Sequence, residues 1–439
     1  MSPAFLPTIL DDIDSILQRS VDEFVKNRNS GLARAVVLAT SSQEPVLLSS
    51  VAGYEQVLEN LDESPTVSDE SLFPLWSATK LVAVIAAMQL VEQGKLRLED
   101  DASKYVPELR DLKVLVGFDD DDKPRWEEPK HAPTVENLIT HTAGFKYMYD
   151  PNYTKYHKQE GLASIYDEDS TRETLTRSPF LVQPGIEYTY GTANDWLALT
   201  VANVSGLPFD QYLEREIFEP LGITDMTFTN PRNRVSTATV PEPAQGSDAA
   251  ATGSTSASEA VATPAAPAFV FDQDRQFPQA IAWGGAGLTG SARSYLKILR
   301  MLLRSGASPV EGRGPILRRD TVDLMFRPRF DDKVLETFLP FVKEGNDPWS
   351  HKRKEQFPGV NHGLGGTLSG EGFPSGRSKG AMTWSGAANT FWVVDRQKDV
   401  AFVVWTSLLP HSHPSLMDVW EKVEPKIYEG LSASASAKH

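Results

Sequence analysis

The chain has 439 residues, no cysteine and a formal net charge of −16 at pH 7. The lack of cysteine excludes disulfide bonds, thiolate catalysis and cysteine-ligated zinc, and the strong negative charge argues against nucleic acid or anionic membranes as partners. The 40% share of hydrophobic residues supports a sizeable core, in one large domain or several smaller ones.

The first predicted elements are a helix and a β-hairpin. Apolar residues recur at three- and four-residue steps over residues 8–28, which predicts an amphipathic helix. The segments 33–39 and 45–53 are strand-like, and the short polar turn between them predicts that they pair.

A Ser-x-x-Lys pair, Ser77 and Lys80, stands where the next helix begins. Residues three apart share a helix face, so the two side chains can meet. Residues 81–93 are apolar nearly all round, which predicts a buried helix. A serine becomes a nucleophile when a neighbouring base takes its proton, and a buried lysine can be that base. The bland alternative is a helix-capping serine beside a solvated lysine.

The middle of the chain begins with a charged stretch. Four consecutive aspartates at 119–122 lack the spaced ligands of a calcium loop, so we interpret them as a solvated turn. A short helix is predicted over 133–145, and we interpret His141 within it as a packed, hydrogen-bonded histidine rather than a general base. The tyrosine-rich loop that contains Tyr147 is either core filler or the wall of an apolar pocket.

Two further helices are predicted at 193–204 and 212–222. Residues 233–268 have almost no large apolar side chains, which is typical of a disordered surface loop. The glycine-rich segment 282–290 lacks a phosphate-loop lysine, so we interpret it as a tight turn before a helix at 291–305.

Three strand-like runs, 380–384, 389–395 and 400–406, predict a meander, followed by a helix near 414–429. The tail, 431–439, is predicted to be flexible.

The order of these elements predicts an α/β (α+β) architecture. An antiparallel sheet flanked by helices would use residues 1–110 and 280–430, and a mostly helical domain, 111–279, would be inserted into it. A site would lie in the cleft between the two. We expect a cytoplasmic protein, because the sequence shows no secretory signal and its longest apolar run is too short to span a bilayer.

Motifs in a fixed order carry a resemblance to a known family. They are Ser77-Ala78-Thr79-Lys80, the stretch from Pro184 to Thr192, and the stretch from Thr383 to Ala388. Together they resemble the serine β-lactamase-like superfamily, which has the class C β-lactamase fold, and in particular its esterase and transesterase branch. The resemblance covers roughly residues 10–425. Within that branch the chain is most similar to the fungal acyltransferases that attach the side chain of lovastatin-type statins, which implies a fungal origin and a role in secondary metabolism.

The resemblance implies roles for individual residues. Ser77 would be the nucleophile, Lys80 its activating partner and Tyr190 a base or proton shuttle, with Tyr188 as the competing candidate for that place. The backbone N–H groups of Ser77 and Ala387 would form the oxyanion hole. The substrate pocket would be lined by Tyr147, Tyr188, Trp384, Gly386 and Trp392.

The sequence departs from the β-lactamase pattern in two places. Tyr190-Gly191-Thr192 lacks the asparagine of the Tyr-x-Asn motif, and Trp384-Ser385-Gly386 replaces Lys-Thr-Gly. We therefore expect a serine esterase or acyltransferase that forms an acyl-enzyme from an ester or thioester of a small apolar acyl group or polyketide-like metabolite. The alternatives are a β-lactamase or D-amino-acid peptidase, and a non-catalytic binding protein. No metal or organic cofactor is implied; a small acyl donor and water or an alcohol are the expected partners of a monomer.

Overall fold

The computed structural model describes residues 7–28, 30–163, 165, 170–228, 281–346 and 358–436. The predicted loop at 233–268 lies outside these residues, as does the end of the predicted tail.

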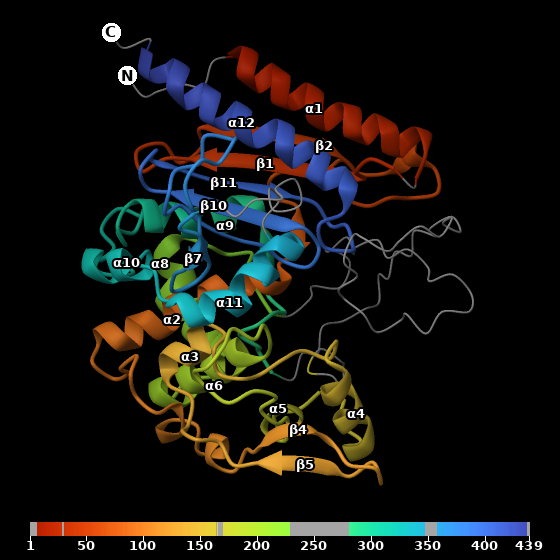
Figure 1. The fold of residues 1–439 in the computed structure, drawn as a ribbon. Coiled ribbons are helices and arrows are strands. Elements are labelled where there is room, and N and C mark those ends of the chain that lie inside the picture. Colours follow the sequence, from red (N-terminus) through yellow and green to blue (C-terminus); the bar gives the residue numbers. More distant parts are fainter. Residues whose placement is uncertain are drawn as a thin grey trace.

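A seven-stranded antiparallel sheet crosses the upper part of the molecule in Figure 1. In spatial order its strands are β2 (Leu48–Gly53), β1 (Arg34–Thr40), β11 (Val400–Trp405), β10 (Thr390–Asp395), β9 (Met382–Trp384), β8 (Thr367–Leu368) and β7 (Asn361–His362). The predicted hairpin and the predicted meander are both confirmed. Every residue of β1, β10 and β11 is buried, as expected for strands covered on both faces.

Helices cover both faces of this sheet. Helices α1 (Pro7–Lys26) and α12 (Pro414–Ser436) lie side by side on one face, where Ile13 and Trp420 share a core cluster with Phe402 of the sheet. Helix α9 (Ala292–Leu303) packs against β1, β10 and β11 from the opposite face. The predicted last helix is longer than expected: α12 continues to Ser436, into the tail that the sequence predicts to be flexible.

A mostly helical region lies below the sheet in Figure 1. Its helices are α3 (Val135–Ile139), α4 (Pro151–Glu160), α5 (Arg172–Thr176), α6 (Ala193–Ser205), α7 (Phe209–Leu213), π-helical η5 (Glu214–Phe218) and α8 (Glu219–Leu221), and its strands are β4 (Val114–Phe118) and β5 (Pro124–Glu127). The predicted helix over 133–145 is shorter than expected. Its N-terminus is capped by Thr134 and Asn137, and the chain leaves the helix at His141, which has a φ of 57°.

Helix α2 (Thr79–Glu92) packs against α6 and is buried from Thr79 to Leu90, so the predicted buried helix is confirmed. The remaining elements are shorter or were not expected from the sequence. They are β3 (Leu72–Pro74), β6 (Thr289–Ser291), α10 (Arg319–Met325), α11 (Asp332–Phe341), π-helical η6 (Val342–Asn346), and the 3₁₀ turns η1 (Leu61–Glu63), η2 (Trp76–Ala78), η3 (Ala102–Lys104) and η4 (Pro107–Arg110).

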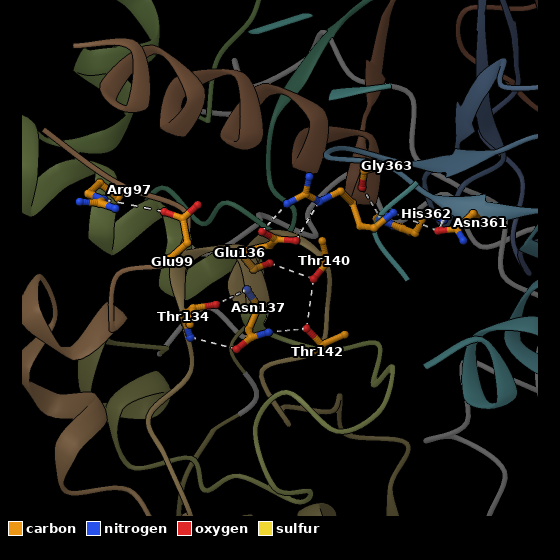
Figure 2. A network of polar contacts seen from close by, with 11 residues as sticks. Arg97, Glu99, Thr134, Glu136, Asn137, Thr140, Thr142, Asn361, His362 and Gly363 are labelled. Carbon is orange, nitrogen blue, oxygen red and sulfur yellow. Dashed lines mark hydrogen bonds and ion pairs between the residues drawn. The ribbon is translucent and has the colours of Figure 1, made fainter. Parts of the chain in front are cut away.

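A polar network joins the helical region to the edge of the sheet (Figure 2). Figure 2 labels two of its members, Glu136 of α3 and Asn361 of β7. The guanidinium of Arg329 donates to Glu136, with Nε 2.8 Å from Oε1. The backbone N–H of Arg329 donates to Asn361 Oδ1 at 3.1 Å, on strand β7. One arginine therefore ties α3 to the β7 edge.

Candidate active site

Ser77 lies in η2, at the turn between strand β3 and helix α2. The N–H of Leu75 donates to the carbonyl of Leu288 at 2.8 Å, which fixes this turn to the segment before β6. Trp76 has a φ of 46°, a left-handed conformation that is uncommon for a bulky residue. Ser77 itself is half-buried, so its hydroxyl is placed at the edge of the buried α2 helix.

Lys80 projects from the first turn of α2 and is 3% exposed. Its Nζ donates to three oxygens: Ser77 Oγ at 3.0 Å, Tyr147 Oη at 2.9 Å and the carbonyl of Gly285 at 2.7 Å. An ammonium has three donors, so all of them are used inside the protein. The alternative of a helix-capping serine beside a solvated lysine does not agree with this buried, fully hydrogen-bonded ammonium.

Tyr190 supplies a second contact to the serine. Its Oη donates to Ser77 Oγ at 2.7 Å, and Lys80 Nζ lies 4.9 Å from the centre of its ring. The ring packs beside Trp384, with centroids 5.6 Å apart, and the Tyr190 backbone carbonyl accepts a hydrogen bond from Tyr149 Oη at 2.8 Å. Ser77, Lys80 and Tyr190 therefore form one hydrogen-bonded group.

Tyr188 does not join this group. Its ring is 5% exposed and packs against Phe330, Phe338 and Phe341, and among the described residues its hydroxyl has no hydrogen-bond partner. Burial raises the pKa of this phenol well above its usual value. Of the two candidate tyrosines, it is Tyr190 whose hydroxyl reaches Ser77.

The third motif lies against the Ser77 turn. A Cβ on Gly386 would lie 2.1 Å from the carbonyl oxygen of Leu75, so only glycine allows this approach. Ala387, the next residue, is half-buried. Trp384 pairs in register with Trp392 across β9 and β10. Trp392 has no exposed surface, so contact with a substrate would require the core around it to open.

His141 lies beside the group without a hydrogen bond to Ser77. Its ring centre is 4.8 Å from that of Tyr190, and Nε2 is 3.5 Å from Asn194 Nδ2. Burial, and then the positive charge of Lys80, lower its pKa well below the usual value, so the imidazole is neutral at pH 7. The predicted packed histidine is consistent with this position.

Comparison with known proteins gives the family. A profile of the Beta-lactamase family matches residues 17–419. The chain belongs to the beta-lactamase family. It is 30% identical over 409 residues to a lovastatin esterase from Penicillium rubens, covering 91% of this chain and 95% of that protein. It is 29% identical to a monacolin J acid methylbutanoyltransferase from Aspergillus terreus, covering 84% and 85% of the two chains.

The solved structures agree with the sequence relatives. A mutant of simvastatin synthase from Aspergillus terreus superposes with a TM-score of 0.79 at 26% identity, over 97% of this chain and 96% of that one. The predicted fold class and the predicted superfamily are therefore confirmed. This member of the beta-lactamase family is an enzyme of the esterase and acyltransferase type.

The described ranges also bear on metal binding and on membrane insertion. There, no three histidine, cysteine, aspartate or glutamate side chains gather closely enough to hold a metal ion. None of the described helices is long and apolar enough to cross a membrane. The absence of a cofactor, the monomeric state and the cytoplasmic location stay predictions.

No supporting role was predicted for Asn389, which the structure places beside the site. Asn389, with a φ of 62°, donates from Nδ2 to the carbonyls of Leu408 and Pro410 at 2.6 and 2.9 Å and accepts the N–H of Ser412 at 2.7 Å. These bonds hold the turn that carries Ala387. Asparagine is enriched at left-handed positions, which was the available signal.

Proposed function

We propose that this enzyme transfers acyl groups through a covalent acyl-Ser77 intermediate. The observation that carries the proposal is that Ser77 Oγ lies within hydrogen-bond distance of both Tyr190 Oη, at 2.7 Å, and Lys80 Nζ, at 3.0 Å. A serine held by a potential proton acceptor and a cation has the arrangement expected of an activated nucleophile.

In the proposed acylation step, Tyr190 first releases its phenolic proton to solvent, and the resulting phenolate accepts the Ser77 hydroxyl proton as Oγ attacks the carbonyl carbon of an ester or thioester. The Lys80 ammonium stabilises the phenolate before the attack and the charge that develops on Ser77 Oγ during it. The tetrahedral intermediate then collapses, the bond to the leaving group breaks, and the leaving alcohol or thiol receives the proton. Deacylation repeats these steps in reverse, with water or an alcohol as the attacking group.

We propose that the N–H groups of Ser77 and Ala387 bind the oxyanion. Support comes from the turn at Gly386, which approaches Leu75 closely enough to exclude any Cβ. Two backbone donors are sufficient to stabilise a tetrahedral oxyanion.

The residues around the group favour an apolar acyl substrate. Tyr147 packs against Tyr149 and Tyr190, and Tyr190 also packs against Phe341 and Trp384, which stack on each other. Aromatic walls with few polar groups suit an ester or thioester of a small apolar acyl group or a polyketide-like metabolite. The two relatives, a lovastatin esterase and a monacolin J acid methylbutanoyltransferase, support the same substrate class.

The test is intact-mass spectrometry after mixing with a p-nitrophenyl ester of a short acyl chain, with Ser77→Ala as the control. We expect a transient acyl adduct on the wild type, absent in the variant, that is released faster when an alcohol is added. Rapid turnover of nitrocefin would instead favour a β-lactamase. No adduct with esters, thioesters or β-lactams would contradict the proposal and leave a binding protein.

A further inference from the structure

The glycine-rich turn at 284–285 packs tightly on the first turn of α6. A Cβ on Gly284 would lie 2.2 Å from the carbonyl oxygen of Asn194, and a Cβ on Gly285 would lie 2.7 Å from Asp195 Oδ2. Glycine is therefore required at 284, where the clash is with backbone, and a Cβ at 285 would displace the Asp195 carboxylate. This packing brings the turn between α6 on one side and Lys80 on the other.

Asp195 is the charged residue at this contact, and it has no exposed surface. Its Oδ1 accepts the N–H of Gly285 at 2.8 Å, and the carbonyl of the same Gly285 accepts the Lys80 ammonium at 2.7 Å. Its Oδ2 has no hydrogen-bond partner among the described residues. One backbone residue thus connects a buried carboxylate to the buried ammonium of the proposed site.

We propose that Asp195 is the positioning residue for Lys80, aiming the Gly285 carbonyl at its ammonium and supplying the negative charge that balances it. This inference rests on the proposed function of Ser77. The carboxylate acts in two ways: its hydrogen bond fixes the Gly285 peptide, and its charge lies in a buried region where little solvent screens it.

The structure gives a reason to retain a charge here despite its cost. A buried carboxylate is unfavourable unless it is hydrogen-bonded and paired. Burial raises the pKa of the Asp195 carboxyl to about 6, although the positive charge of Lys80 and the hydrogen bond from the Gly285 N–H favour its ionised form. An asparagine could accept the same hydrogen bond from Gly285 without the desolvation cost of a buried charge. The hydrogen bond alone therefore does not explain an aspartate at this position.

The other titratable groups around the pair do not supply this charge. Those facing Lys80 or Asp195 from the neighbouring elements are Tyr147, Tyr190, His141 and, from α4, Tyr153. Burial raises the pKa of Tyr153, and burial lowers that of His141. Both side chains are therefore neutral near pH 6, and in that range the ionisation of Asp195 changes the charge beside Lys80.

The inference is tested with Asp195→Asn, which preserves the acceptor for Gly285 and removes the charge. The measurement is the rate at which a fluorophosphonate labels Ser77, followed by intact mass. We expect Asp195→Asn to slow labelling roughly 10- to 100-fold at pH 7, the loss typical of an interaction with a charged group. The wild-type rate should fall as the pH decreases through about 6, and the variant should lack that decrease.

A double-mutant cycle separates positioning from a general structural effect. In a Lys80→Ala background, Asp195→Asn should change the labelling rate less than about 3-fold, because the group it acts through is gone. Asp395→Asn, another buried carboxylate at the end of strand β10, is the matched control and should leave the wild-type labelling rate unchanged.

The outcomes distinguish this inference from the proposed function. Wild-type protein that does not label at Ser77 would overturn both. Wild-type labelling with an unchanged rate in Asp195→Asn would overturn the role of Asp195 alone. If Asp195→Asn changed the labelling rate equally in the presence and absence of Lys80, the inference would also be overturned, because Asp195 would then act independently of the lysine.

Discussion

The hydroxyl of Tyr190 lies 2.7 Å from Ser77 Oγ, although 113 positions separate the two residues in the chain. Tyr188, only two residues before Tyr190, is enclosed by phenylalanines instead. Removing the hydroxyl of Tyr190 should therefore lower activity, whereas removing that of Tyr188 should not.

Tyr190→Phe should lower kcat/KM for a p-nitrophenyl ester by about 10²- to 10⁴-fold, the usual contribution of a positioned acid or base. Tyr188→Phe is the matched control: it deletes a hydroxyl that has no partner among the described residues, so activity should stay within about 3-fold. Its free energy of unfolding should be unchanged or higher by about 1 kcal/mol. A larger loss in Tyr188→Phe than in Tyr190→Phe would reverse the assignment.

Tyr147→Phe separates two possible roles of Tyr147. If its ring only lines the pocket, the variant keeps that ring and its activity. Because its Oη accepts a hydrogen bond from Lys80 at 2.9 Å, we expect kcat to fall about 10-fold with little change in KM. Tyr156→Phe, on helix α4 against Trp126, serves as the control with an unchanged rate. Wild-type kinetics in Tyr147→Phe would leave it the lining role alone.

Asn389→Ala should lower the free energy of unfolding by about 3–5 kcal/mol, measured by urea denaturation. The change removes three hydrogen bonds, and the alanine keeps the left-handed φ of 62° without the side-chain bonds that stabilise this conformation in asparagine. Asn389→Gly also loses the bonds but tolerates the backbone, so it should be about 1 kcal/mol less destabilised. Both variants should lose activity, because the turn they loosen carries Ala387. Full activity per folded molecule would show that Ala387 does not depend on this support.

Asp195→Asn should make the protein more stable at neutral pH. Burial raises the pKa of the Asp195 carboxyl from 3.8 to about 6 in the folded state. Between these two values the unfolded chain releases the proton and the folded protein retains it, so wild-type stability falls as the pH rises from about 4 to 6. Above pH 6 the raised pKa lowers the free energy of unfolding of the wild type by about 3 kcal/mol.

The variant should therefore exceed the wild type by up to about 3 kcal/mol at pH 7, with the difference vanishing near pH 4. Urea denaturation at several pH values measures it. Asp395→Asn should have the opposite sign, because both Asp395 oxygens accept hydrogen bonds, from Ser378, Gln397, Lys398 and Tyr428. A pH-independent difference for Asp195→Asn would contradict the raised pKa.

Local patterns were sufficient to predict much of the fold. Ser77 and Lys80 are three residues apart, so the helix itself brings them together. Helix α2 and the strands β9, β10 and β11 were also predicted, because their runs of apolar residues indicate buried elements. The short pairs β3–β6 and β7–β8 were not predicted, since two or three residues carry too little pattern.

The tertiary structure alone decided which distant groups meet. The resemblance to the family favours Tyr190 by its spacing from Pro184-Gly185, but the segment is irregular and has no fixed side-chain period, so it does not itself show which tyrosine faces Ser77. The Gly285 carbonyl reaches Lys80 across 205 positions, and Asp195 reaches Gly285 across 90. The sequence determined the pairing of Ser77 with Lys80 through helix geometry, whereas the packing of α6 and the glycine turn around that pair determined which residues support it.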